Sequence, residues 1–217
     1  GAEMRAAFTH GIINAHAGDL PRFRGNACPN WAILNGEEKV VLSLHQMNQD
    51  LDAGPILQKK HFSLTESTYI GDIYKFLDYA IPVGFAEALS SMENGATIFT
   101  EQSKDPLDSL RCFPRMPGDS GVNWTLSAKE LSKLVRASSE PFAGAFALLN
   151  GERLIIWRAR AEIIPYPSLG VCGQVVHIDA DQGEAWILCG EGALVLEQVE
   201  FRGVNSKPTD FIHSSRT

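Results

Sequence analysis

Two short apolar runs early in the chain each lead into polar residues, and this arrangement constrains the fold more than any other feature. Residues 11–13 are followed by Asn14 and His16, and residues 40–44 are followed by Asp52. Alternate side chains of a strand share one face, so Asn14 and His16 are expected to point the same way. We predict two adjacent parallel strands that bring the three polar side chains to one edge of an α/β sheet.

The three side chains suit acyl transfer to an amine. An amide can donate a hydrogen bond to a developing oxyanion, and an imidazole can exchange a proton near neutral pH. A carboxylate can orient the imidazole and favour its charged form. No Ser or Cys is placed as a nucleophile, so direct attack by a substrate amine fits better than an acyl-enzyme. Each residue also has a structural interpretation as a hydrogen-bonded histidine or a turn residue, which spacing alone favours.

Three motifs of the chain resemble those of the folate-dependent formyltransferases. The motifs, similar to the family's Asn-x-His, Leu-Pro-x-x-x-Gly and Leu-Asp-x-Gly, are Asn14-Ala15-His16, Leu20-Pro21-Arg22-Phe23-Arg24-Gly25 and Leu51-Asp52-Ala53-Gly54. The resemblance implies a Rossmann-like domain and formyl transfer from 10-formyltetrahydrofolate to a primary amine, without a metal. It makes Asn14, His16 and Asp52 the catalytic trio. Where the family usually has Ser-Leu before Leu-Pro, this chain has Gly18-Asp19, so contacts of that pair are not carried over.

Further binding residues are expected around this trio. The resemblance implies that the backbone of the segment before and including Asp52 lines the pterin pocket. That segment consists of Asn48, Gln49, Asp50, Leu51 and Asp52. Arg22 and Arg24 are candidates for a substrate phosphate, with solvated surface arginines as the alternative. Either His16, oriented by Asp52, or Asp52 acting through a water is expected to remove the amine proton.

Composition and charge narrow the class of protein and of acceptor. With 44% hydrophobic and 21% charged residues among 217, the chain is typical of a globular protein with one large or two small domains. It has no run of about 18 apolar residues and no signal peptide, so we expect a cytoplasmic protein without a membrane span. Its four cysteines show neither CxxC nor zinc-ligand spacing, which favours free thiols over disulfides.

The amine acceptor is expected to be a nucleotide-linked amino sugar. The net charge is −7, and residues 117–217 hold nine Lys/Arg against twelve Asp/Glu, which makes a nucleic-acid partner unlikely. Residues 30–37 and 140–146 also look more like the nucleotide-sugar N-formyltransferases than like methionyl-tRNA formyltransferase. A homo-oligomer is possible. The rival interpretations are methionyl-tRNA formyltransferase, a formyltetrahydrofolate hydrolase, and a catalytically silent folate- or nucleotide-binding module.

Element signals predict two domains of different class. Residues 1–100 are expected to be the later part of a formyltransferase domain whose first portion is absent from this chain. After a helical piece at 2–8, we predict a helix at 29–34, strands at 40–47 and 56–62, and a helix from 68 that continues past Pro82 to about 92. The Pro- and Gly-rich residues 101–121 are expected to be a linker.

Residues 122–217 are expected to form a small, open, OB-like β-barrel domain. A capping box at 127–130 predicts a helix. Strands at 143–149 and 153–160 flank Asn150-Gly151, which predicts a hairpin. Further strands are expected at 173–178, 185–188 and 193–199.

Overall fold

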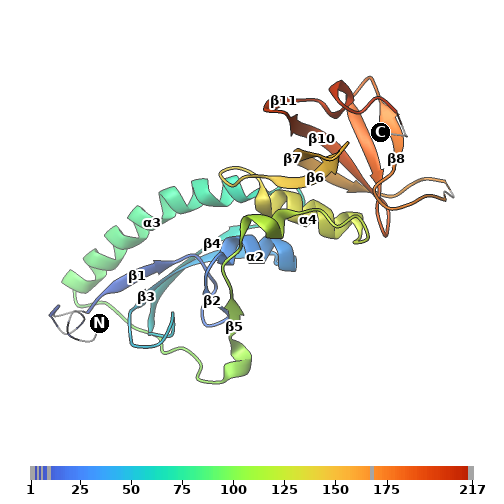
Figure 1. The fold of residues 1–217 in the computed structure, drawn as a ribbon. Coiled ribbons are helices and arrows are strands. Elements are labelled where there is room, and N and C mark those ends of the chain that lie inside the picture. The colour runs from blue at the N-terminus through green and yellow to red at the C-terminus, as the bar shows by residue number, and fades with distance from the viewer. Residues whose placement is uncertain (1–2, 4, 6, 9–10, 167–168, 215–217) are drawn as a thin grey trace. The chain divides into compact units, whose positions relative to one another are not determined.

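A computed structural model describes residues 3, 5, 7–8, 11–166 and 169–214, so part of the helical piece expected at 2–8 lies outside the described residues. The chain separates into two compact units, drawn in Figure 1. Unit 1 comprises Gly1–Thr68 and Asp72–Arg115, and unit 2 comprises Tyr69–Gly71 and Met116–Thr217.

Unit 1 contains a three-stranded antiparallel sheet. Its strands, in the order β1-β3-β4, are β1 (Ile13–His16), β3 (Lys39–Gln46) and β4 (Ile56–Ser63). The register pairs Asn14 with His45 and His16 with Ser43. The prediction that adjacent parallel strands bring the trio together is therefore wrong, because β1 and β3 run in opposite directions. A short apolar run indicates burial but carries no information on the direction of its partner strand.

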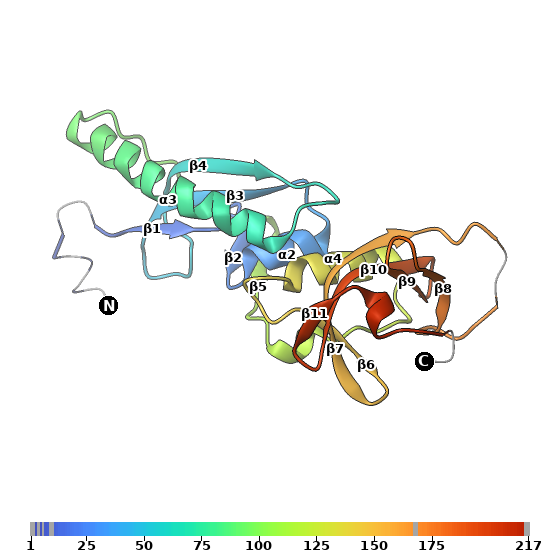
Figure 2. The ribbon, with the colours of Figure 1, turned by 90° about the horizontal axis from the view of Figure 1, so that it is seen from above.

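Strand β3 is buried on both faces, which explains why its sequence is almost continuously apolar. One face, which includes Leu44, meets the long helix α3 (Ile70–Glu93), which lies along the sheet in Figures 1 and 2. A Cβ on Gly84 of this helix would lie only 3.1 Å from Leu44 Cδ1, so the glycine permits the close approach. Ser43 and His45 alternate to the opposite face, where the candidate site is built.

The segment expected to be a linker, residues 101–121, contains a strand that belongs to unit 1. Strand β5 (Leu110–Cys112) pairs in parallel with β2 (Phe23–Gly25). Helix α2 (Cys28–Asn35) follows β2, and its Trp31 donates its indole N–H to the carbonyl of Phe113 at 2.8 Å. The expectation of a linker is therefore wrong for residues 101–115, which pack with the first unit rather than merely connecting two domains.

Unit 2 consists of a helix packed on an antiparallel sheet. Its main strands, in the order β6-β7-β10-β9-β8, are β6 (Ala145–Leu149), β7 (Glu152–Glu162), β10 (Ala193–Phe201), β9 (Glu184–Leu188) and β8 (Val175–Asp179). Helix α4 (Ala128–Ser138) starts at the predicted capping box, in which Ser127 accepts from the backbone N–H of Glu130. Leu131 and Val135, one turn apart, are fully buried in the core beneath this helix.

The predicted hairpin joins β6 to β7, and its turn residues Asn150 and Gly151 have φ of 53° and 82°, which suits Asn-Gly. A short strand, β11 (Val204–Ser206), adds to β10, and Figure 2 shows it in red beside that strand.

The end strands β6 and β8 do not pair with each other among the described residues. The predicted fold class, an α/β part followed by a small β domain, is confirmed. Over the described residues, the sheet of the domain expected to be an open, OB-like barrel does not close. The part of the chain that the structure describes also contains three one-turn 3-10 helices, at Pro106–Asp108, Pro117–Ser120 and Pro208–Asp210.

Candidate active site

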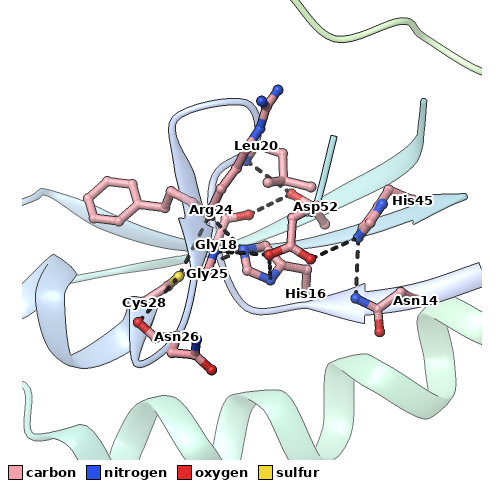
Figure 3. Close-up of polar contacts among 12 residues, drawn as sticks. Asn14, His16, Gly18, Leu20, Arg24, Gly25, Asn26, Cys28, His45 and Asp52 are labelled. Carbon is pink, nitrogen blue, oxygen red and sulfur yellow. Dashed lines mark hydrogen bonds and ion pairs between the residues drawn. The ribbon is translucent and has the colours of Figure 1, made fainter. Parts of the chain in front are cut away.

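Antiparallel pairing of β1 with β3 gathers polar side chains on the face of the sheet opposite helix α3. Asn14 lies across from His45, and His16 lies across from Ser43, so the four side chains share one face. Three of them are buried, with His16, Ser43 and His45 exposing 8%, 0% and 2% of their surface. Figure 3 shows Asn14, His16, His45 and Asp52 pointing toward one another.

The hydrogen bonds of His45 define its protonation state. Its Nδ1 lies 3.2 Å from the carbonyl oxygen of Gln46, which can only accept, so Nδ1 carries the hydrogen. Its Nε2 lies 3.2 Å from Nδ2 of Asn14, which can only donate, so Nε2 accepts. Burial lowers the pKa of His45, partly opposed by the Gln46 carbonyl and the Asp52 carboxylate, and this favours the neutral ring.

His16 is fixed in a different way. Its Nε2 donates to the carbonyl oxygen of Phe23 at 2.6 Å, which leaves Nδ1 as the basic nitrogen of the neutral ring. That Nδ1 lies 3.6 Å from Oδ2 of Asp52. A proton accepted at Nδ1 therefore faces the carboxylate directly, and the pair is suited to sharing a proton taken from a substrate.

Asp52 lies in the turn between β3 and β4 and reaches both imidazoles. Besides the contact with His16, its Oδ1 lies 3.7 Å from Nε2 of His45. Its Oδ2 also accepts the backbone N–H of Gly25 at 2.9 Å. The backbone of Asp52 has φ of 49°, in the left-handed region that few residues other than glycine adopt without cost. Strands β1 and β3 run in opposite directions, but this turn still places the Asp52 carboxylate beside the two histidines.

The loop after His16 is held tightly against the sheet. Ser43 Oγ donates to the carbonyl of Gly18 at 2.7 Å, and Lys59 forms a 2.7 Å ion pair with Asp19. A Cβ on Gly18 would lie 2.4 Å from Nε2 of His16, so a glycine at this position leaves the space that the imidazole occupies. Gly18 and Asp19, the residues that depart from the family pattern, therefore have packing roles of their own.

Cys28 is the thiol next to this cluster, with its Sγ 3.8 Å from Nε2 of His16. Burial raises the pKa of the Cys28 thiol far above its usual value, with a smaller contribution from Cys112. Because the thiolate is the nucleophilic form, the environment suppresses nucleophilic attack by this residue. The site therefore offers an amide, two imidazoles and a carboxylate, but no activated nucleophile among the described residues.

The two arginines considered for phosphate binding are both engaged by protein groups. Arg22 is exposed and makes a bidentate pair with Glu37, at 2.5 and 2.8 Å, which raises the pKa of Arg22 and lowers that of Glu37. Arg24 is half-buried and donates from Nη2 to Oε1 of Gln102 at 2.7 Å. The Nε of Arg24 is buried without a hydrogen-bond partner in the described part of the chain.

The residues expected to line a pterin pocket form the exposed part of the turn before Asp52. Asn48, Gln49, Asp50 and Leu51 are all exposed, and the side chain of Asn48 accepts the backbone N–H of Asp50 at 2.9 Å. The pocket assignment stays a prediction. Over the residues that the structure describes, no group of three His, Cys, Asp or Glu is arranged to hold a metal ion, and no helix is long and apolar enough to cross a membrane.

Sequence reasoning missed His45, which belongs to this cluster, and Gln102, which contacts the turn that carries Asp52. His45 gives a signal, because Ser43 and His45 interrupt an apolar strand at the same i, i+2 spacing that identified Asn14 and His16. Gln102 gives none, since it lies 50 residues after Asp52 in an irregular segment.

Both parts of the chain match models of one protein family. The model described as "Formyl transferase" matches residues 1–89. The model described as "Formyl transferase, C-terminal domain" matches residues 116–216. The chain belongs to the formyl transferase family. The cluster at Asn14, His16, His45 and Asp52 lies within the first matched region of this formyl transferase.

Several solved structures share the fold. HypX from Aquifex aeolicus in complex with tetrahydrofolic acid has a TM-score of 0.66 and 22% identity, over 91% of this chain and 34% of that chain. An N-formyltransferase from Helicobacter canadensis, in complex with folinic acid and dTDP-3-aminofucose, has a TM-score of 0.66 and 18% identity, over 88% of this chain and 67% of that chain. Methionyl-tRNA formyltransferase from Clostridium thermocellum has a TM-score of 0.54 and 18% identity, over 69% of this chain and 63% of that chain. This formyl transferase thus spans about a third of the length of HypX.

Proposed function

We propose that the protein transfers a formyl group from 10-formyltetrahydrofolate to the primary amine of a nucleotide-linked amino sugar. The observation that carries this proposal is the convergence of Asn14, His16, His45 and Asp52 on one face of the sheet. The cluster combines an oxyanion donor, a proton acceptor and an orienting carboxylate without an activated nucleophile. Direct attack by an amine needs these groups and no others.

The hydrogen bonds of Asn14 suit the role of oxyanion donor. An asparagine amide has two N–H groups, and His45 accepts one of them. This bond orients the amide so that the second N–H is directed to the negative charge that develops on the formyl oxygen. Because His45 is kept neutral by burial, its Nε2 remains an acceptor and does not compete with Asn14 as a donor.

The pair of His16 and Asp52 suits the role of proton acceptor. 10-Formyltetrahydrofolate supplies a formyl group attached to a nitrogen leaving group. As the amine nitrogen forms its bond to the formyl carbon, its proton passes to Nδ1 of His16, and the Asp52 carboxylate 3.6 Å away stabilises the charge that results. The same pair returns the proton to the leaving nitrogen as the original carbon–nitrogen bond breaks. The Phe23 carbonyl holds the opposite nitrogen of the ring throughout.

Two observations support an amino sugar as the acceptor. The solved relative from Helicobacter canadensis is an N-formyltransferase in complex with dTDP-3-aminofucose. The chain is also acidic, which disfavours the phosphate-rich surface of tRNA. Arg24 is a candidate for the nucleotide phosphates, because its guanidinium has donors beyond the one that Gln102 accepts.

The proposal is tested by incubating the full-length protein with 10-formyltetrahydrofolate and a panel of UDP- and dTDP-linked amino sugars. We expect at least one sugar to gain the mass of a formyl group while tetrahydrofolate is released in equal amount. The same sugar bearing a hydroxyl in place of the amine serves as the control and stays unmodified. Release of formate at the same rate with and without the amine would instead identify a hydrolase and overturn the proposal.

A further inference from the structure

We propose that Gln102 is a positioning residue that holds the turn carrying Asp52, and that Arg24 fixes the orientation of its amide. This inference rests on the proposed function, in which Asp52 takes part in proton transfer. Among the residues that the structure describes, Gln102 has hydrogen bonds to Arg24 and to the backbone of the turn, and none to either imidazole. It therefore acts on Asp52 through the backbone of the turn. It lies outside every motif that identified the site.

The side chain of Gln102 uses both of its N–H donors on the turn and its carbonyl oxygen on Arg24. It is buried, with 7% of its surface exposed, and its Nε2 donates to the carbonyl of Asp52 at 2.9 Å and to the carbonyl of Gly54 at 2.7 Å. Its Oε1 accepts from Nη2 of Arg24 at 2.7 Å. Carbonyl oxygens only accept and a guanidinium only donates, so the amide has a single orientation that satisfies all three partners.

The turn needs such support because its backbone conformation is unfavourable by itself. Asp52 has φ of 49°, in the left-handed region that a non-glycine residue adopts only at a cost in free energy. Two carbonyl groups of the turn, at Asp52 and Gly54, would also lack these partners without Gln102. Removing the two donors therefore frees the turn to relax toward a commoner conformation, which moves the carboxylate away from the histidines.

The position of Gln102 is fixed by backbone hydrogen bonds of the residues just before it. Thr100 and Ile56 form an isolated antiparallel bridge with two backbone hydrogen bonds of 2.8 Å. This bridge places the residues after Thr100 beside the beginning of β4 and hence beside the turn. On the other side, Gly25, the neighbour of Arg24, donates its N–H to the carboxylate of Asp52. Asp52 is thus held from two directions, by its backbone and by its side chain.

The decisive comparison is between Gln102→Glu and Gln102→Leu. The glutamate keeps the length of the side chain and pairs with Arg24, but it turns an acceptor toward two carbonyl oxygens. If the two N–H donors hold the turn, both variants lower kcat by about tenfold to a hundredfold, the scale expected when a catalytic group is displaced by about 1 Å. The KM for 10-formyltetrahydrofolate should change much less than kcat.

A matched control is Gln58→Leu. Gln58 also donates from Nε2 to a backbone carbonyl in unit 1, that of Gly84 at 3.2 Å, but it lies on β4 away from the cluster. The Gln58→Leu variant should keep the wild-type kcat. The melting temperature of this variant shows how much the loss of a glutamine hydrogen bond destabilises the fold. Wild-type kcat in Gln102→Glu would overturn the proposal, because it would show that partnering Arg24 is sufficient.

A second readout does not depend on activity. The backbone N–H of Gly25 reports the position of the Asp52 carboxylate. In the ¹⁵N-labelled protein at fixed pH, both Gln102 variants should shift the Gly25 amide resonance and speed its hydrogen exchange, whereas Gln58→Leu should not. An unchanged Gly25 amide in folded Gln102→Leu overturns the positioning role. If the wild type formylates no amine, the proposed function fails, and the Gly25 amide still decides whether Gln102 holds the turn.

Discussion

His45 is a buried imidazole that the fold keeps neutral. The largest influence on the pKa of His45 is burial, which lowers it, and electrostatic interactions with the neighbouring His16 and Arg24 side chains lower it further. The carbonyl of Gln46 and the carboxylate of Asp52 act in the opposite direction without cancelling this effect. Neutrality matters because only the unprotonated Nε2 can accept from Asn14.

This lowered pKa predicts a stability change with acid. In the unfolded chain a histidine gains a proton near pH 6.5, whereas folded His45 resists protonation. The contribution of neutral His45 is therefore complete above about pH 6.5 and is lost as the pH falls through that value toward the lower folded-state pKa. We expect the free energy of unfolding of the wild type to fall more steeply between about pH 7 and pH 5 than that of His45→Gln, which keeps an acceptor without titrating.

The comparison is made by urea denaturation over this pH range. His61→Gln is the control, because His61 is an exposed residue of β4 and should leave the slope unchanged. Parallel curves for wild type and His45→Gln would contradict the conclusion that the folded site excludes the proton.

The second residue-scale prediction concerns His16. Replacing His16 with Asn keeps a hydrogen-bond donor but removes the nitrogen that faces Asp52. Losing a general base costs about 10²–10⁴-fold, so we expect kcat for formyl transfer to fall by at least about 10²-fold while folate affinity changes little. His61→Asn serves as the matched control. Near-normal turnover in the His16 variant would leave this imidazole as a structural residue, as spacing alone suggested.

At the scale of elements, the turn between β3 and β4 is the part of the site most sensitive to crowding. A Cβ on Gly54 would lie 1.8 Å from the carbonyl oxygen of Gln46, a backbone atom that cannot rotate away. We expect Gly54→Ala to lower the free energy of unfolding by about 1–3 kcal/mol and to reduce kcat together with it, because Asp52 must move with the turn. Gly118→Ala, where an added Cβ meets nothing within 4 Å, is the control. Both quantities unchanged in the Gly54 variant would contradict the account of the turn.

Elements with a local pattern could be predicted from the sequence, and those that depend on distant pairing could not. Helix α3, the capped helix α4 and the hairpin at Asn150-Gly151 each carry their own periodicity, cap or turn residues. Strands β2, β5 and β11 have three residues each, too few to show alternation. Two of them, β2 and β5, lie more than 80 residues apart in the chain and specify each other only in the folded state.

The same distinction applies to the site. Asn14, His16 and Asp52 could be predicted because their motifs are local, although the strand direction proposed to unite them was wrong. His45 was missed because it lies outside the three motifs, although its spacing from Ser43 gives a signal. Gln102 is recognisable only through the bridge of Thr100 with Ile56, which no local pattern indicates.

At the scale of the whole molecule, the net charge favours a nucleotide-linked amino sugar over tRNA as the acceptor. The net charge is −7, and Asp/Glu outnumber Lys/Arg within the last hundred residues. A protein that grips RNA gains affinity mainly by neutralising phosphates, and this affinity depends steeply on salt. We expect no shift of initiator tRNA by the full-length protein between about 50 and 200 mM salt. A salt-dependent shift of the tRNA that added nucleotide sugars do not reverse would instead favour tRNA as the acceptor.

The parallel pairing of β2 with β5 sets a rule for where this chain can be divided. The family model for the first domain ends at residue 89, yet unit 1 extends to Arg115 and includes Gln102 and β5. A protein shortened after helix α3 would keep all four residues of the cluster and lose what holds the Asp52 turn. Exchange of carboxy-terminal domains between relatives should therefore be made after residue 115, so that the candidate site and the segment carrying Gln102 stay in one protein.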